Sequence, residues 1–145
     1  MPEWDESVSA PENARSRLPG MVEAWFQRGR ALAAPEANSP AALHSFRIRT
    51  KRLRYTLEMF RPFYGPRLDA RLAALREVQT CLGELNDCAV TRGLIEPALK
   101  PGPQRARLEA FLDRRTTELT AAFKKTWAAL DKAGEDARWR AYLAR

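Results

Sequence analysis

Residues 68–94 read LDARLAALREVQTCLGELNDCAVTRGL, and their leucines recur in a nearly heptad pattern. The recurring positions are Leu68, Leu72, Leu75, Leu82 and Leu85. This spacing places the five side chains along one side of an α-helix, where they can pack against neighbouring helices. The segment therefore predicts a long helix with a single apolar seam.

Helical periodicity also runs through the stretches on either side of this segment. Breaks rich in Pro, Gly, Asn and Ser separate them, at Pro35 with residues 38–40, at residues 64–66 and at residues 101–103. The other predicted helices cover residues 21–34, 41–60, 104–132 and, as a short C-terminal helix, 136–143. Ser39 and Pro40 fit the N-cap and first position of the second helix. Because no run of alternating β-branched residues occurs, we expect an all-α fold, an antiparallel four-helix bundle with a short C-terminal helix.

The length and composition favour one globular domain. A chain of 145 residues and 16.5 kDa is long enough for one core and too short for two ordinary domains. No apolar run approaches the roughly 18 residues of a membrane span, and the N-terminus lacks the features of a signal peptide. We expect a cytoplasmic protein with no membrane partner. Its single domain would cover residues 20–145, after a flexible N-terminal arm at residues 1–19 that contains three prolines.

The positive charge of the chain is concentrated in one region. Between Ala41 and Arg71, eight Lys or Arg residues stand against Glu58 and Asp69, so this region carries a formal +6 of the chain's +7. A local excess of charge indicates a binding site, whereas an even spread indicates solubility alone. Residues 43–54, LHSFRIRTKRLR, contain five of these basic residues, no acid and the chain's one histidine.

On a helical wheel, this segment presents a basic stripe, which we define as His44, Arg47, Lys51 and Arg54. Apolar arcs flank the stripe on both sides. One arc contains Phe46, Leu53, Leu57 and Phe60, and the other contains Ile48, Tyr55 and Met59. Like charges at these spacings repel, and Glu58 alone is placed to compensate, so we expect an external anion. Alternatively, the long basic side chains cover apolar surface with their heads in water, and His44 is a structural hydrogen-bonding residue.

Polar residues interrupt the apolar seams of two predicted helices. Gln79 and Asn86 fall on the leucine seam, where an unpaired amide costs about 1 to 3 kcal/mol, so each should bond to a neighbouring helix. Asp87 either orients an arginine of the basic stripe or is a surface carboxylate.

A second group of basic residues lies in residues 104–132. Arg115 falls on the apolar seam there, with Arg114 and Lys125 beside it. A buried arginine requires an acidic partner or a bound anion. We therefore expect these three residues to extend the anion site.

Cys81 and Cys88 are seven residues apart in one predicted helix, too far along its axis for an easy disulfide. No histidine lies near enough in sequence to complete a zinc site with them. We expect both to be small core residues, and we expect neither a metal nor a cofactor.

Two segments together resemble the CHAD domain, the conserved histidine α-helical domain. They are HSFRIRTKRLR at residues 44–54 and LGELND at residues 82–87, and both match in order and separation. The resemblance covers residues 20–132. It implies a helical bundle that binds inorganic polyphosphate without catalysing its turnover. The implied binding residues are His44, Arg47, Lys51, Arg52 and Arg54, to which the helical wheel adds Arg114, Arg115 and Lys125.

The chain departs from the family pattern at two points. Typical members resemble two tandem four-helix units with the anion channel between them, whereas this chain has one unit. Asn86 stands where the family often has arginine. We therefore expect a two-fold homodimer, with the arc of Ile48, Tyr55 and Met59 at or near the contact. Because related domains are often found beside triphosphate tunnel enzymes, such an enzyme is a candidate partner, and polyphosphate granules are a candidate location.

Two other functional classes compete with polyphosphate binding. The same charge permits nucleic-acid binding, although Tyr55 is the one aromatic residue in the stripe region available for base stacking. A metal-dependent phosphohydrolase built on a helical bundle usually has paired Glu residues and a Glu-x-x-His motif, and the motif does not occur. We therefore expect a non-catalytic binding module, with nucleic-acid binding as the alternative.

Overall fold

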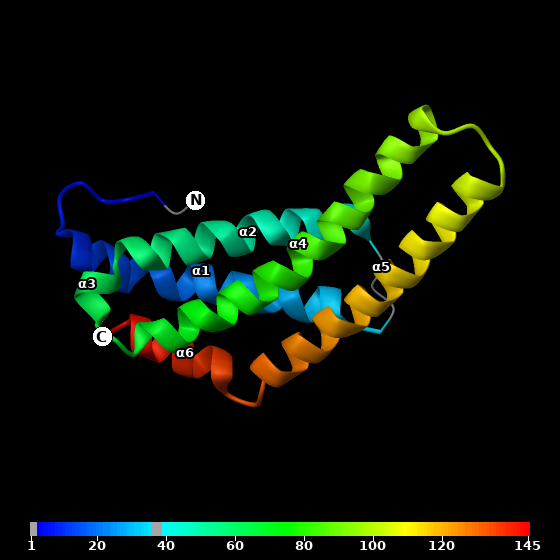
Figure 1. Cartoon of the computed structure of the whole chain (residues 1–145). Coiled ribbons are helices and arrows are strands. Elements are labelled where there is room, and N and C mark those ends of the chain that lie inside the picture. The colour runs from blue at the N-terminus through cyan, green and yellow to red at the C-terminus, as the bar shows by residue number, and fades with distance from the viewer. Residues whose placement is uncertain (1–2, 36–38) are drawn as a thin grey trace.

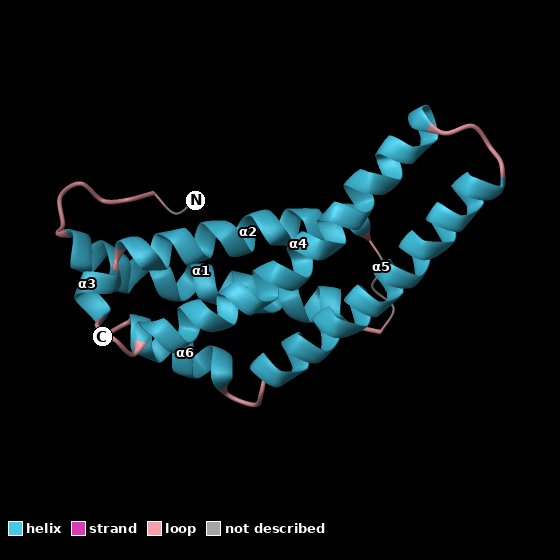
Figure 2. Cartoon of the chain, in the orientation of Figure 1, coloured by secondary structure: helices cyan, strands magenta, loops and turns pink. Residues whose placement is uncertain are grey.

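The structure is a computed structural model that describes residues 3–35 and 39–145. All regular secondary structure in these two ranges is helical, and they contain no strand (Figure 2). The helices are α1 (Ala10–Ala33), α2 (Pro40–Met59), α3 (Arg61–Tyr64), α4 (Leu68–Ala98), α5 (Pro103–Leu130) and α6 (Glu135–Leu143). The predicted all-α fold and its short C-terminal helix are confirmed. Asn38, part of one predicted break, lies outside the described residues.

The long helices run in alternating directions along the chain (Figure 1). α2 packs against both α1 and α4, α4 packs along α5, and α6 packs against α1. The outer halves of α4 and α5 extend as a hairpin beyond the other helices (Figure 1). The helices are therefore not matched in length, and a regular antiparallel four-helix bundle remains a prediction.

The first helix begins earlier than the sequence predicted. α1 starts at Ala10, not at residue 21, so half of the expected N-terminal arm is helical. Ser9 and Glu12 form a capping box: the Ser9 hydroxyl accepts from the Glu12 amide at 3.4 Å, and the Glu12 carboxylate accepts from the Ser9 amide at 2.9 Å. Leu18 is fully buried within this added part of the helix. The predicted start was wrong because two prolines, Pro11 in the first turn and Pro19 inside the helix, suggested breaks.

α4 contributes the apolar seam that the sequence predicted. All five leucines of the heptad pattern are buried. Cys88 is buried and Cys81 is half-buried against the same core, and both thiols are free. The prediction that both are small core residues is therefore confirmed.

An aromatic cluster centred on Trp25 joins α1 to α2, α5 and α6. The Trp25 ring stacks on Phe46 at 5.6 Å and on Trp139 at 6.0 Å between ring centroids, and Trp127 lies 5.0 Å away. The indole N–H of Trp25 donates to the buried hydroxyl of Thr50 at 2.9 Å. This directional bond fixes the rotation of α2 about its axis, and with it the direction in which the basic stripe points.

Candidate anion-binding site

The start of α2 determines where the basic stripe begins. The Ser39 hydroxyl accepts from the Ala42 amide at 3.2 Å, and Pro40 occupies the first turn, as the sequence predicted. Phe46, Leu53 and Leu57 are buried on the core side of the helix. The residues of the basic stripe therefore lie on the flank of α2 beside α4.

Two amides of α4 hold two residues of the basic stripe. Nδ1 of His44 is 2.9 Å from Oδ1 of Asn86, and Nε of Arg54 donates to Oε1 of Gln79 at 2.9 Å. Because an amide oxygen only accepts, Nδ1 is the donor in the histidine contact. The prediction that both seam amides bond to a neighbouring helix is confirmed.

Arg47 crosses α4 at Gly83. A Cβ atom added to this glycine would lie 4.0 Å from Nε of Arg47, so the absent side chain leaves room for the guanidinium. Nε of Arg47 is buried, and within residues 3–35 and 39–145 it has no hydrogen-bond partner. Leaving such a donor unpaired costs about 1 to 3 kcal/mol, and an anion oxygen would pair with it once the guanidinium turns outward to meet the anion.

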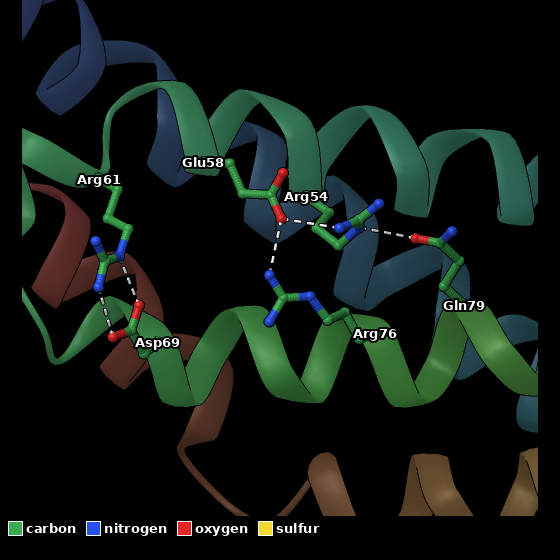
Figure 3. Close-up of polar contacts among 6 residues, drawn as sticks. All are labelled: Arg54, Glu58, Arg61, Asp69, Arg76 and Gln79. Atoms are coloured by element: carbon green, nitrogen blue, oxygen red, sulfur yellow. Dashed lines mark hydrogen bonds and ion pairs between the residues drawn. The ribbon is translucent and has the colours of Figure 1, made fainter.

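Glu58 holds two cations at the far end of the basic stripe. Its Oε1 accepts from Nη1 of Arg54 at 2.8 Å and from Nη2 of Arg76 at 3.1 Å (Figure 3). Figure 3 also shows the adjacent pair of Arg61 and Asp69, joined by two hydrogen bonds of 2.8 and 2.9 Å. The hydrogen bonds from Arg61 hold the pKa of the Asp69 carboxyl below its ordinary value. One carboxylate shared by two arginines leaves this end of the stripe positive.

These contacts form one row, which we name the α2–α4 ladder. It contains His44, Arg47, Lys51, Arg54 and Glu58 of α2 and Arg76, Gln79, Gly83 and Asn86 of α4. Lys51 belongs to it by helical spacing and makes no hydrogen bond or ion pair with any described residue. Sequence reasoning missed Arg76. The signal was its spacing, because residues 76, 79, 83 and 86 recur at the three- and four-residue steps of one helix face.

Arg52 lies away from the ladder. It lines a pocket between α1 and α2 together with Arg17 and Arg49. The resemblance grouped Arg52 with the basic stripe, but it is one residue from Lys51, and neighbouring residues on a helix point about 100° apart.

The predicted site residues of α5 make no hydrogen bond or ion pair with the basic stripe among the described residues. Arg115 was predicted to be buried, and this was wrong: its side chain is 43% exposed, with Glu118 at 3.6 Å and Glu84 at 3.9 Å. Arg114 and Lys125 are exposed. Asp87 is exposed too, and no hydrogen bond or ion pair in the described ranges links it to an arginine of the stripe. No such contact joins any α5 residue to the stripe either.

Two further properties concern the described residues as a whole. They contain no group of three or more His, Cys, Asp and Glu side chains placed to hold a metal ion. None of the described helices is both long enough and apolar enough to cross a membrane.

Comparison with known families identifies this part of the chain. The family model of the CHAD domain matches residues 2–96, a range that includes both motif segments and nearly all of α4 but not α5. No curated protein and no solved structure matches the chain.

Proposed function

The chain belongs to the CHAD domain family, whose members are binding modules associated with polyphosphate, and we propose that it binds inorganic polyphosphate along the α2–α4 ladder without catalysing its turnover. The polymer lies against the basic stripe, and two copies of the chain form a two-fold dimer. The observation that carries this proposal is the buried, unpartnered Nε of Arg47 above Gly83.

The chemistry of the ladder suits a chain of phosphates. Guanidinium groups bind phosphate oxygens bidentately, and lysine adds a compact point charge. Residues at three- and four-residue steps follow one side of the helix, at about 5.4 Å per turn, so the basic groups form a row rather than a single pocket. A row of donors fits a linear polyanion better than one isolated phosphate.

Each residue of the stripe has its own role in this proposal. Arg47 and Lys51 have no acidic partner in the described part of the chain, so their charges face the anion without competition. Gln79 orients Arg54 and Asn86 orients His44, and both do so without adding negative charge. Arg52 and the basic residues of α5 contact the polymer only where it extends beyond the ladder.

Nucleic-acid binding is the second candidate, and the surroundings of Tyr55 speak against it. The Tyr55 side chain is 49% exposed, but the Arg54 guanidinium covers its ring at 4.4 Å from the centroid. On the ring face that the guanidinium covers, a base could stack only by displacing the arginine from its bonds to Glu58 and Gln79. The ladder therefore offers charge without a free stacking platform.

The test is to replace Arg47, Lys51 and Arg54 together with alanine and to titrate polyphosphate at several salt concentrations. By the behaviour of nucleic-acid phosphates, each lost contact lowers the slope of log K against log salt by about 0.7 to 0.9. The triple variant should therefore lose about two to three units of slope and at least about 100-fold in affinity at low salt.

The matched control replaces Arg28, Lys100 and Arg107, which are exposed and lie outside the ladder. It removes the same charge and should lose much less affinity. Equal losses in the two variants would show binding to the overall charge rather than to the ladder. In a competition at equal charge, polyphosphate should displace single-stranded RNA, and the reverse order would favour the nucleic-acid alternative.

A further inference from the structure

A second cluster of arginines lies on the other side of α2, away from the ladder. Arg17 of α1 and Arg49 and Arg52 of α2 line a pocket of about 520 Å³ between the two helices. Among the described residues, no carboxylate lines this pocket. The α2–α4 ladder does not explain why these three positive charges are grouped at one pocket.

The three arginines are free of protein partners. None of their guanidinium groups makes an ion pair or a hydrogen bond with another described residue, whereas Arg30 and Arg61 each hold a carboxylate within 2.8 Å. Nε of Arg17 is buried and lacks any partner in residues 3–35 and 39–145. Three cations that line one pocket, one of them with a buried, unsatisfied donor, favour the binding of an anionic group.

Asp5, whose charge interacts with that of Arg17, does not bond to this cluster. The pKa of Asp5 lies below its ordinary value, chiefly because the side chain and backbone of Ser7 donate hydrogen bonds to its carboxylate, with a smaller contribution from the charge of Arg17. Asp5 is thus bonded within its own turn. Its charge weakens the field of Arg17 but leaves the guanidinium unbonded.

Apart from Ser16, the rest of the pocket wall is apolar. Met21, Trp25 and Leu53 contribute to it, and the indole N–H of Trp25 is already bonded to Thr50. Gly20 also lines the pocket, and a Cβ atom added there would meet nothing within 4 Å, so the space above it is open. A bare phosphate would use the arginines alone, whereas a phosphate carrying an organic group would also contact the apolar wall, chiefly at Met21, because Trp25 and Leu53 are each only 2% exposed.

We propose that this pocket binds a small phosphate ester. Its phosphate lies between Arg17, Arg49 and Arg52, and its organic group lies against Met21, Trp25 and Leu53. The site lies outside the α2–α4 ladder and shares only Arg52 with the proposed path of the polymer. A nucleotide and the headgroup region of a lipid share this chemistry, and the test separates them.

The test measures binding by calorimetry, with adenosine monophosphate and a short-chain phosphatidic acid as probes of the two sources. Two compounds are the controls: adenosine has the organic group without a phosphate, and pyrophosphate has phosphate without an organic group. At least one phosphate ester should bind, at least 10-fold more tightly than either adenosine or pyrophosphate, and the tighter ester identifies the source. In spectra of the ¹⁵N-labelled protein, the Nε–H resonance of Arg17 should shift on binding. Failure of both esters to bind, or pyrophosphate binding as tightly as the better ester, would overturn the proposal.

Two variants and a control locate the site. Gly20→Leu fills the pocket without changing the charge, and α1 tolerates it because the backbone at Gly20 does not have positive φ. Gly20→Leu and Arg17→Gln should each weaken ester binding at least 10-fold, while Arg28→Gln, an exposed position of α1 outside the pocket, should not. Gly20→Leu should bind polyphosphate as the unchanged protein does. The experiment therefore distinguishes a failure of the phosphate-ester proposal from a failure of the polyphosphate proposal. If Gly20→Leu binds the ester as tightly as the unchanged protein does, the ester does not bind in this pocket.

Discussion

The residues that orient the basic stripe are mostly uncharged. Asn86 holds His44, Gln79 holds Arg54, and Gly83 leaves the space that Arg47 crosses. Carboxylates in the same positions would orient the cations equally well but would neutralise them. Amides and glycine keep the side chains in place while their charge stays available, which is what an anion site needs.

Glu58 is the one charged residue among the described residues that orient the basic stripe, and its replacement tests whether the stripe binds the anion. Its carboxylate accepts from both Arg54 and Arg76, so it competes with any anion for two cations. Glu58→Gln should raise polyphosphate affinity several-fold and should lower the free energy of unfolding by at most about 1 kcal/mol, because these pairs are partly exposed. Binding titrations and urea unfolding measure the two effects.

The matched control is Glu77→Gln, which removes one exposed negative charge from α4. If Glu77→Gln raises the affinity as much as Glu58→Gln does, net charge alone explains the gain. A loss of affinity in Glu58→Gln would instead mean that Glu58 is needed to orient Arg54.

The size of the side chain at position 83 should affect polyphosphate binding through Arg47. A methyl group would lie in ordinary contact with Arg47, 4.0 Å from Nε, so Gly83→Ala should keep polyphosphate binding and stabilise α4 by about 1 kcal/mol. Gly83→Leu should displace the guanidinium and weaken binding, although the helix itself forms more readily. Titrations and chemical unfolding of both variants check this, and tight binding by Gly83→Leu would show that Arg47 does not need the space.

At the scale of the helices, prediction from sequence succeeded where one periodic signal dominated. The five leucines of α4 identified that helix and its buried side, and the need to satisfy Gln79 and Asn86 predicted their contacts with another helix. The start of α1 was missed because proline chemistry was given more weight than the capping residues Ser9 and Glu12. Arg76 was missed although its spacing places it on the same helix face as Gln79, Gly83 and Asn86, because that spacing does not show which helix lies opposite.

Arg52 shows a different limit of the sequence. A motif fixes the spacing of its residues but not the neighbour that each side chain meets. The position of Arg52 beside the α1 pocket depends on the rotation of α2, and that rotation is set by packing across the core and by the bond between Trp25 and Thr50. Such long-range contacts are not encoded in a local pattern.

Gly29 of α1 lies against Trp127 of α5, and this close contact predicts how adding one methyl group at Gly29 changes the stability of the protein. A Cβ atom at Gly29 would overlap the buried ring of Trp127, which is confined by the aromatic cluster. Gly29→Ala should therefore lower the free energy of unfolding by about 2 kcal/mol, since overpacking outweighs the gain in helix propensity. Gly20→Ala in the same helix meets no atom and should instead stabilise the protein. Thermal unfolding of both variants measures the contrast, and a stable Gly29→Ala would contradict this close approach.

For the molecule as a whole, two groups of exposed apolar side chains lie on the long helices. On α2, Ile48 is 38%, Tyr55 49% and Met59 73% exposed, beside the basic stripe. Near the end of the α4–α5 hairpin, the exposed side chains are Val90, Leu94, Leu108 and Phe111. Apolar groups of this kind mark interaction surfaces. The α2 group is the one that would bring two basic stripes together.

A two-fold contact at α2 would link dimerisation to the anion. Two facing stripes repel each other when empty, and this repulsion is strongest at low salt because it is least screened. Bound polyphosphate neutralises both stripes, so a ligand that binds the dimer better than the monomer must also strengthen the dimer. The dimer should therefore tighten with polyphosphate and loosen in low salt without it.

Light scattering measures the mass directly, with and without polyphosphate, for two double variants matched in the charges that they introduce. Ile48→Asp with Met59→Lys places polar groups on the α2 surface and should leave the protein monomeric even when polyphosphate is present. Leu94→Asp with Phe111→Lys does the same at the hairpin and should leave the dimer intact, because that end lies away from the basic stripe. Loss of the dimer in the hairpin variant alone would move the contact to the ends of α4 and α5. A monomeric unchanged protein at every concentration, with and without polyphosphate, would exclude the two-fold arrangement and leave the stripe as an open surface on one chain.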